Sequence, residues 1–240
     1  MPAKTVAPPN LNAPPPVRGR VRLDLHAHSR YSPDSRLDPV EIVKVARQRG
    51  LDGIAITDHN AVEGAQKAWE YGRSVGFLVI RGTEISTDVG HVLAYGVAQA
   101  IPRGRTVPST VDAVLALGGV PVAAHPYRIW SGLGERPTVS APFAAYEVKN
   151  ARTLERGNVR AAALAARRHV GGTGGSDAHY LREVARAVTI VEEASTEEEV
   201  LDALRRGRTR GEGVDRGAGA SLRYGTKAVG EWMLRGFRRI

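Results

Sequence analysis

The chain has 240 residues, no cysteine and a formal net charge of +9. The absence of cysteine excludes disulfides and thiolate metal sites, so any metal must be held by imidazole and carboxylate groups. No apolar run approaches the roughly 20 residues of a membrane span, and the N-terminus lacks the apolar core of a signal peptide, so we expect a cytoplasmic protein without a membrane segment.

The positive charge is concentrated at the two ends of the chain. Residues 1–20 carry three basic and no acidic residues, and residues 203–240 carry ten basic and three acidic ones. The residues between them carry 21 basic and 22 acidic residues. Basic ends are typical of solvated tails, or of contact with nucleic acid or another polyanion. Neither end interleaves aromatic residues that would stack on bases, which favours solvated tails but leaves nucleic acid open as a partner.

The order of elements begins with an arm that has no regular pattern. Residues 1–20 contain six prolines and no periodic apolar face, which predicts an extended or disordered arm. Short apolar runs then alternate with amphipathic segments. We predict strands at residues 21–25, 53–57, 77–83, 91–95, 120–124, 146–149, 171–175 and 187–191.

Helix-start signals lie between several of these strands. Asp38 precedes Pro39 and Glu41, a combination of N-cap, first-turn proline and capping-box glutamate, and this helix should run to Gly50. Further helices should start at Ser109 and at Thr196, and residues 157–169 read as an Ala/Arg-rich helix.

Strands alternating with helices predict a mainly parallel α/β architecture, and eight short strands fit a compact barrel. We find no internal repeat or domain break, so residues 21–215 should form a single barrel domain. Residues 216–240 form a basic tail in which Trp232, Met233 and Phe237 could dock on the barrel.

Polar residues gather at the edges of the predicted strands. Six of the seven histidines lie there: His26, His28, His59, His91, His125 and His179. Glu84 ends the third strand, and Asp177 follows the glycine-rich one. Because the C-terminal ends of parallel barrel strands share one face, these side chains should converge.

The spacing of these residues favours metal binding. Residues i and i+2 of an extended segment point the same way, so His26 and His28 can hold one ion together, and so can Asp177 and His179. Imidazole and carboxylate ligands suit zinc, manganese or iron, and a carboxylate such as Glu84 can bridge two ions. The run GGTGGSDAH leads into Asp-x-His rather than into a helix, so we reject a dinucleotide-binding interpretation.

Six motifs occur in a fixed order: HxH followed by Asp, then TDH, GTE, a following His, AHP and SDAH. This set, between Leu23 and Val191, resembles the polymerase-and-histidinol-phosphatase (PHP) superfamily of metal-dependent phosphoesterases. The resemblance implies a distorted TIM-like (β/α)7 barrel with three divalent ions, manganese, zinc or iron, at the C-terminal ends of the strands. It places the first ion on His26, His28, Glu84 and Asp177, the second on Glu84, His91 and His125, and the third on Asp34, His59 and His179.

The spacing between Glu84 and His91 indicates which branch of this superfamily the chain resembles. His91 follows Glu84 by seven residues, which resembles the branch of small nucleotide phosphatases and RNA-trimming relatives. The short run from Pro126 to Gly175 leaves little room for the domain commonly inserted in that branch, so the substrate of those relatives is not carried over.

The predicted site suggests a hydrolytic mechanism. A hydroxide bridging the first two ions would attack phosphorus, and the third ion would hold a phosphate oxygen. Asp177 and His179 are candidates for protonating the leaving oxygen. Arg128, Lys149 and Arg152 are candidates for binding phosphate. Asp58 and Glu147 are candidates for orienting ligands, and His169 reads as structural.

We therefore expect an enzyme that hydrolyses phosphomonoesters or small nucleotide phosphate esters. One alternative is an exonuclease or RNA-trimming enzyme that uses the basic ends. Another is a non-catalytic subunit of an RNA–protein particle, against which the complete ligand set argues. The sequence leaves the substrate, the native metal and the oligomeric state open.

Overall fold

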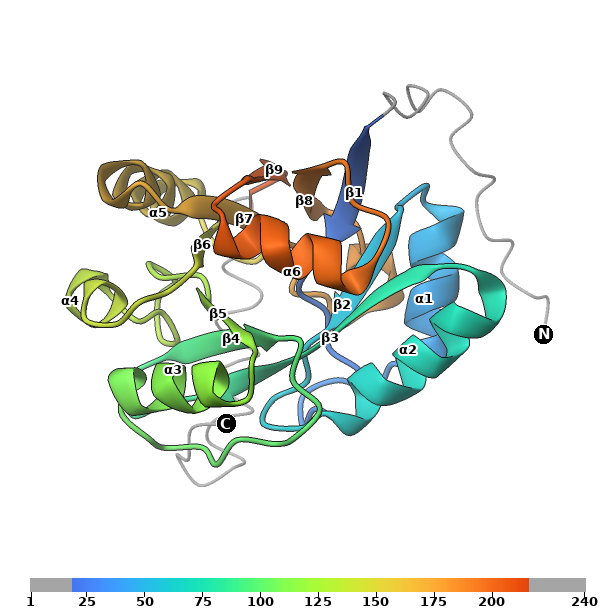
Figure 1. Cartoon of the computed structure of the whole chain (residues 1–240), viewed down its shortest axis with the longest axis horizontal. Coiled ribbons are helices and arrows are strands. Elements are labelled where there is room, and N and C mark those ends of the chain that lie inside the picture. The colour runs from blue at the N-terminus through green and yellow to red at the C-terminus, as the bar shows by residue number, and fades with distance from the viewer. Residues whose placement is uncertain (1–18, 216–240) are drawn as a thin grey trace.

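The computed structural model describes residues 19–215, and within them one nine-stranded sheet curves into a barrel (Figure 1). Neighbouring strands follow the order β7-β6-β5-β4-β3-β2-β1-β8-β9. The predicted N-terminal arm, apart from Gly19 and Arg20, and the predicted basic tail lie outside the described residues. The strands are β1 (Arg20–Asp24), β2 (Gly53–Ile56), β3 (Leu78–Ser86), β4 (His91–Tyr95), β5 (Val120–Ala123), β6 (Ala145–Asn150), β7 (Gly171–Gly175), β8 (Ala187–Glu192) and β9 (Thr209–Gly213).

The α/β barrel that was predicted is confirmed, and each of the eight predicted strands is present within three residues of its expected bounds. The expectation of a mainly parallel sheet is wrong. Four pairings are parallel, and four are antiparallel: β3–β4, β4–β5, β1–β8 and β8–β9. The connection between β3 and β4 is a tight turn in which Thr87 N donates to Gly90 O. A turn of this length is too short for the crossover that a parallel pair needs.

Six α-helices lie between the strands in the described range: α1 (Pro39–Gln48), α2 (Glu63–Val75), α3 (Val107–Ala116), α4 (Glu135–Val139), α5 (Glu155–Arg168) and α6 (Glu197–Arg205). A short 3-10 helix, Leu181–Glu183, lies between β7 and β8. Asp38 caps α1, and Thr196 with Glu199 completes the capping box of α6, as predicted. The predicted start at Ser109 is wrong, because Thr106 caps α3 and accepts a hydrogen bond from Ser109 N. His169 ends α5 in the left-handed conformation.

The glycines of β7 let this strand approach β8 and the end of β1 closely. A Cβ atom on Gly174 would lie 2.3 Å from Val188 O, and one on Gly175 would lie 2.3 Å from His26 Cβ. Gly174 N instead donates to Thr189 Oγ1 at 2.8 Å, which ties β7 to β8. The glycine-rich run is thus a closely packed strand that brings the two ends of the sheet together.

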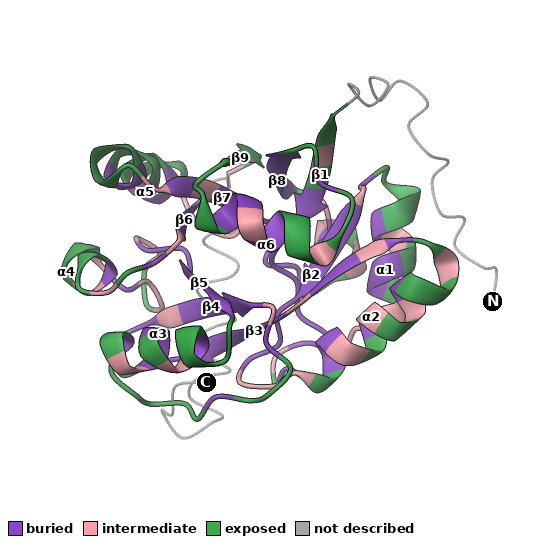
Figure 2. Ribbon diagram, viewed as in Figure 1, coloured by how far each residue is buried: buried purple, intermediate pink, exposed green. Residues whose placement is uncertain are grey.

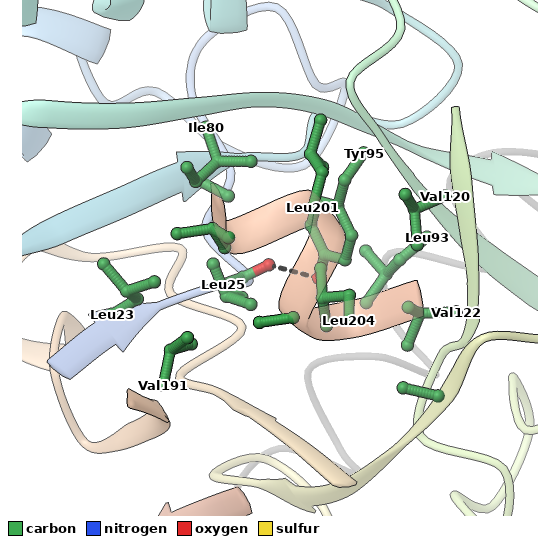
Figure 3. Packing of buried hydrophobic residues seen from close by; sticks show 14 of the residues in the cluster. Leu23, Leu25, Ile80, Leu93, Tyr95, Val120, Val122, Val191, Leu201 and Leu204 are labelled. Carbon is green, nitrogen blue, oxygen red and sulfur yellow. Dashed lines mark hydrogen bonds between the residues drawn. The ribbon is translucent and has the colours of Figure 1, made fainter. Parts of the chain in front are cut away.

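The helices cover the outside of the barrel except for α6, which closes one end. Figure 2 shows buried faces of α1 and α2 turned toward the strands and exposed faces turned outward. Leu201 and Leu204 of α6 pack among the apolar side chains that fill the barrel, including Leu25 and Tyr95 (Figure 3). Each such buried side chain stabilises the fold by about 1.5–3 kcal/mol. The core therefore occupies the α6 end, and Tyr95 Oη reaches across it to donate to Leu25 O at 2.7 Å.

Candidate metal centre

The segments that follow β1 and β7 lie side by side at the barrel end opposite α6. Ala27 and Ala178 form an isolated parallel bridge, flanked by hydrogen bonds from His28 N to Ala178 O and from Asp177 N to His26 O. Asp177 adopts a φ of 53°, so the extended backbone expected there is wrong. The side chains converge nevertheless, with His28 Nε2 and His179 Nδ1 each 3.5 Å from Asp177 Oδ1.

The β3–β4 hairpin brings Glu84 and His91 to the same end. Because β4 runs antiparallel to β3, its first residue lies beside the C-terminal end of β3, and His91 Nδ1 is 2.9 Å from Glu84 Oε1. A bridge between His59 and Glu84 fixes the segment after β2 against β3. The antiparallel strand therefore explains why a histidine at the start of a strand joins others that follow strand ends.

Glu84 lies at the centre of the cluster and is buried. Its two carboxylate oxygens lie within 3.4 Å of ring nitrogens of five histidines: His26, His28, His59, His91 and His125. Burial alone would raise the pKa of Glu84, but the charges of His91, His26 and His59 and the hydrogen bond with His125 hold it well below its usual value. Glu84 is thus ionised, and its two oxygens face different histidines, as is needed for a carboxylate that bridges two ions.

A second set of donors lies on the other side of His28. His179 Nε2 is 2.8 Å and His59 Nε2 is 3.7 Å from Asp34 Oδ2. Burial would raise the pKa of Asp34, but its contacts with His179, His59 and His28 lower it. Asp34 therefore belongs to the cluster rather than to an ordinary surface turn.

The structure gathers all nine predicted ligands. In four groups of three residues, the donor atoms lie within 4.8 Å of one another: His26, His28 and Glu84; His26, His125 and Asp177; His28, Asp34 and His179; and His59, Glu84 and His91. The grouping differs from that implied by the resemblance, because Asp34 and His179 group with His28 rather than with His59. Every predicted ligand is nonetheless in one of the groups.

The donor set fits divalent cations. Asp34 Oδ1, His59 Nδ1 and His125 Nδ1 are buried without a hydrogen-bond partner, although buried polar atoms are normally paired. Burial would lower the pKa of His28, yet hydrogen bonds with Asp177 and Glu84 raise it to about 9. Burial lowers the pKa of His59 to about 3 despite the nearby charge of Glu84. The carboxylates thus favour positive charge at His28, where a divalent cation could replace the proton, while a neutral His59 and the unpaired atoms offer further ligand positions.

Glu147 fixes several of these groups from behind. Its carboxylate contacts His26 Nδ1 at 3.0 Å, accepts from His125 N at 2.8 Å and accepts from Asn150 Nδ2 at 3.2 Å. With a proton on Nδ1, His26 directs the lone pair of Nε2 toward Glu84 and His28. Glu147, predicted as an orienting group, therefore lies where that role requires.

Serine residues support the opposite side of the cluster. Ser32 Oγ contacts His28 Nδ1 at 3.1 Å and accepts from His59 N at 3.0 Å. Asp58, predicted to orient a ligand, accepts hydrogen bonds from Ser29 N and Ser29 Oγ instead, and so fixes the loop after His28. The contacts of Ser32 were not predicted from the sequence, because serine is a common residue in turns and the run Ser-Pro-Asp-Ser is typical of a turn without any other role.

Two of the three predicted phosphate-binding residues lie at Asp177. Arg128 Nη1 donates to Asp177 Oδ2, and Arg152 Nη1 contacts His179 Nδ1 and lies 3.7 Å from Asp177 Oδ1. Burial would raise the pKa of Asp177, but Arg128, His26 and Arg152 are among the groups that lower it well below its usual value. Lys149 is not in this group, since its Nζ pairs with Asp215 at 2.8 Å.

A β-bulge explains the position of Lys149. The register between β6 and β7 shifts between Glu147 and Lys149. An extra residue reverses the alternation of faces along a strand, so Asn150 rather than Lys149 follows Glu147 into the site. Asn150 Nδ2 lies 3.2 Å from Asp177 Oδ2 as well as from Glu147. Asn150 was not predicted as a site residue, because the alternation of residues along a strand does not reveal a bulge.

Family models match the barrel in two segments. The PHP domain model matches residues 24–139, and the PHP-associated model matches residues 155–209. The chain belongs to the PHP family of metal-dependent phosphoesterases. The nine clustered residues described above, from His26 to His179, all lie within these two matched segments.

The chain is also similar to individual curated proteins. The chain is 34% identical over 127 residues to the uncharacterized protein MJ1587 of Methanocaldococcus jannaschii, with 48% of this chain and 74% of that protein covered. It is 33% identical over 84 residues to a 3',5'-nucleoside bisphosphate phosphatase of Chromobacterium violaceum, with 33% and 29% covered. The PHP chain thus spans less than a third of that phosphatase.

A solved structure shares the fold. A two-domain protein from Bacteroides vulgatus, containing a predicted PHP-like metal-dependent phosphoesterase, superimposes with a TM-score of 0.64 at 20% identity and covers 87% of this chain and 69% of its own. Among residues 19–215, no helix is long and apolar enough to cross a membrane.

Proposed function

We propose that this PHP protein hydrolyses phosphomonoesters or small nucleotide phosphate esters with three divalent ions, manganese, zinc or iron. The observation that carries the proposal is a cluster of nine imidazole and carboxylate side chains that includes buried Glu84, with two arginines beside Asp177. The proposal keeps the three sets implied by the resemblance: His26, His28, Glu84 and Asp177 hold one ion, Glu84, His91 and His125 a second, and Asp34, His59 and His179 a third. His59 lies outside the close group of Asp34 and His179, but its Nε2 is 3.7 Å from Asp34 Oδ2 and can join that set.

Bound divalent ions would supply an activated water and polarise a phosphoryl oxygen. Arg128 and Arg152 reach Asp177 from the loops after β5 and β6, and a phosphate bound next to Asp177 would meet both guanidinium groups. Their fixed positions would neutralise charge that develops on the phosphoryl oxygens.

Asp177 and His179 serve in this proposal mainly as ligands. Asp177 accepts hydrogen bonds from Arg128 and Asn150, which favour its ionised form. His179 contacts Asp34 through Nε2 and Arg152 through Nδ1, so neither ring nitrogen is turned to solvent as a proton donor would be. The role of proton donor to the leaving oxygen, expected for these two residues from the sequence, therefore receives less support than their role as ligands.

The alternatives receive less support. Most of the basic residues on which a nuclease or RNA-trimming function depends lie in segments outside the described residues. A non-catalytic subunit would have no need of a complete ligand set, and the three buried polar atoms of the cluster that lack a hydrogen-bond partner would destabilise it. A small phosphorylated substrate therefore agrees best with the described site.

The proposal is tested by assaying the full chain, loaded separately with manganese, zinc or iron, for release of inorganic phosphate from sugar phosphates, mononucleotides and bisphosphorylated nucleotides, and for release of mononucleotides from short RNA. We expect turnover of at least one small ester. His26→Ala and Glu84→Ala should each abolish turnover, because each removes a ligand, while circular dichroism still reports a folded protein.

The matched control is His169→Asn. This seventh histidine ends α5 at a φ of 53°, a conformation that asparagine tolerates, and it lies outside the cluster. Turnover by this variant should equal that of the wild type. The proposal is refuted if the metal-loaded wild type hydrolyses none of the esters, or if His26→Ala retains full turnover.

A further inference from the structure

The loop between β5 and α4, residues 124–134, contains His125 of the candidate metal centre and, four and five residues later, two exposed apolar side chains. It also contains Arg128, which donates to Asp177. Ile129 is 53% exposed and Trp130 is 85% exposed. Trp130 is the most exposed large apolar side chain among the residues that the structure describes.

This loop is held in place at both ends. Arg128 N donates to His125 O at 2.9 Å, Gly132 N to Arg128 O at 3.0 Å, and Gly134 N to Pro126 O at 2.8 Å. A Cβ atom on Gly132 would lie 2.6 Å from the carbonyl oxygens of Arg128 and Pro126, so the turn closes tightly. The exposure of Trp130 thus belongs to a defined turn rather than to a loose strand of chain.

The returning half of the loop packs against the β3–β4 hairpin. A Cβ atom on Gly90, which precedes the ligand His91, would lie 2.8 Å from Leu133 N. Leu133 itself is buried in an apolar cluster with Val92 and Phe143. The apex that carries Trp130 therefore stands between two fixed points, one next to His125 and the other next to His91.

The backbone at the apex is unfavourable for a tryptophan. Trp130 has a φ of 81°, a region that glycine or asparagine occupies more readily than a bulky side chain. A residue selected only for folding would not combine this conformation with an exposed indole, because neither stabilises the chain. A role in contacting a ligand explains both observations, since binding residues are often found on fixed loops.

We propose that Trp130 is a specificity-determining residue on which the nucleobase of the substrate stacks while the phosphate lies against Arg128 and Arg152. Two residues span at most about 7 Å between Cα atoms, so the indole and the guanidinium of Arg128 can reach neighbouring parts of one nucleotide. Aromatic rings accept any base by stacking. This inference rests on the proposed function and deepens it, because it names a base-bearing phosphate ester as the substrate class.

The kinetic test compares wild type, Trp130→Ala and Trp130→Phe in the metal-loaded full chain. Substrates are adenosine 3',5'-bisphosphate, ribose 5-phosphate, which lacks a base, and a 5'-phosphorylated RNA trinucleotide. Trp130→Ala should reduce the preference of kcat/KM for the nucleotide over ribose phosphate about tenfold, equivalent to about 1.4 kcal/mol, mainly through KM. Trp130→Phe should restore most of it, because phenylalanine keeps an aromatic face.

The substrates separate the two sources of a base. If Trp130→Ala loses its preference for the bisphosphate, the substrate is a small nucleotide. If it loses only its preference for the trinucleotide, the substrate is the end of a single strand. Either result supports stacking on Trp130. An unchanged preference in Trp130→Ala for both base-bearing substrates overturns the inference, whereas turnover of ribose phosphate by the wild type leaves the proposed function intact.

Fluorescence tests the inference without turnover. Adding adenosine 3',5'-bisphosphate should quench tryptophan emission in the wild type more than ribose 5-phosphate does, and Trp130→Phe should lose this difference. Trp69→Phe is the matched control, because the Trp69 ring lies on α2 between Arg73 and Arg81, each 4.7 Å away, and it should keep the quench. A quench that persists in Trp130→Phe refutes the role of Trp130 even if no ester is hydrolysed.

Discussion

At the scale of single residues, Glu147 connects more of the candidate site than its position outside the ligand set suggests. One buried carboxylate contacts the ring of His26, the backbone of His125 and the amide of Asn150. Removing a group that hydrogen-bonds the second ring nitrogen of a metal-binding histidine typically weakens metal affinity by about 10- to 100-fold.

We therefore predict that Glu147→Gln lowers metal affinity by about 10- to 100-fold, because an amide has one acceptor oxygen where the carboxylate has two, and it lacks the charge that favours His26. Chelator competition, followed by measurement of bound metal, checks this. The exposed Glu70→Gln on α2 serves as control and should bind metal like the wild type. Equal affinity in both variants would show that Glu147 has no part in ligand orientation.

Eight of the nine clustered residues were accessible from sequence because each lies at the edge of a recognisable strand, whereas Asp34 was included only through the resemblance to the PHP superfamily. His26, Glu84 and Asp177 needed only spacing and the order of motifs to be placed together. Lys149 and Asn150 differ in this respect, because a single extra residue in β6 decides which of them faces the site. A bulge depends on pairing with a neighbouring strand and leaves no periodic trace in the sequence.

At the scale of elements, the path of β7 past His26 depends on residues without side chains. A methyl group on Gly175 would lie 2.8 Å from the backbone nitrogen of His26 and 2.3 Å from His26 Cβ. A methyl group on Gly172, in the same strand, would meet the side chain of Val148 at 2.7 Å as its nearest contact. Backbone atoms cannot move aside as a side chain can.

We predict that Gly175→Ala destabilises the protein by about 1–3 kcal/mol and also lowers metal binding, because the added methyl displaces His26. Gly172→Ala should have a smaller effect on both, since Val148 can change rotamer. Urea unfolding and metal analysis of the two variants provide the comparison. If Gly172→Ala proved as damaging as Gly175→Ala, the close approach to His26 would not be the cause.

Strand existence was predictable, whereas strand direction was not. Apolar runs, and a glycine-rich run for β7, marked β1 to β8. The same alternation of residues occurs in parallel and antiparallel strands, so the reversal of β4 required the three-dimensional structure. β9 has the sequence TRGEG and lies mostly at the surface, so no apolar pattern announces it. Its place is set by backbone pairing with β8.

At the scale of the whole molecule, the candidate metal centre ties together segments from β1, β2, β3, β4, β5 and β7. A cation bound there would bind the folded chain but not the dispersed ligands of the unfolded one, and would therefore stabilise the fold by linkage. Without a bound cation, the buried atoms of the cluster that lack a hydrogen-bond partner lower the free energy of unfolding.

We predict that saturating manganese or zinc raises the free energy of unfolding by about 2.7 kcal/mol when the free ion is at about 100 times its Kd. Thermal unfolding with chelator and with added metal measures the shift. His26→Ala should show a smaller increase than the wild type, which serves as the comparison. An unfolding midpoint that stays constant from chelator to excess metal would contradict binding at this cluster.

The position of α6 determines which end of the barrel remains for binding and release of small molecules. Leu201 and Leu204 fill the end opposite the cluster, together with the apolar side chains that reach up to Leu25 beneath His26. Under the proposed function, substrate and product would therefore pass through the same end of the barrel, and the product would have to leave before the next substrate could bind. If Trp130 stacks on a base as inferred, the residue that recognises the incoming substrate would also lie along the path by which the product leaves.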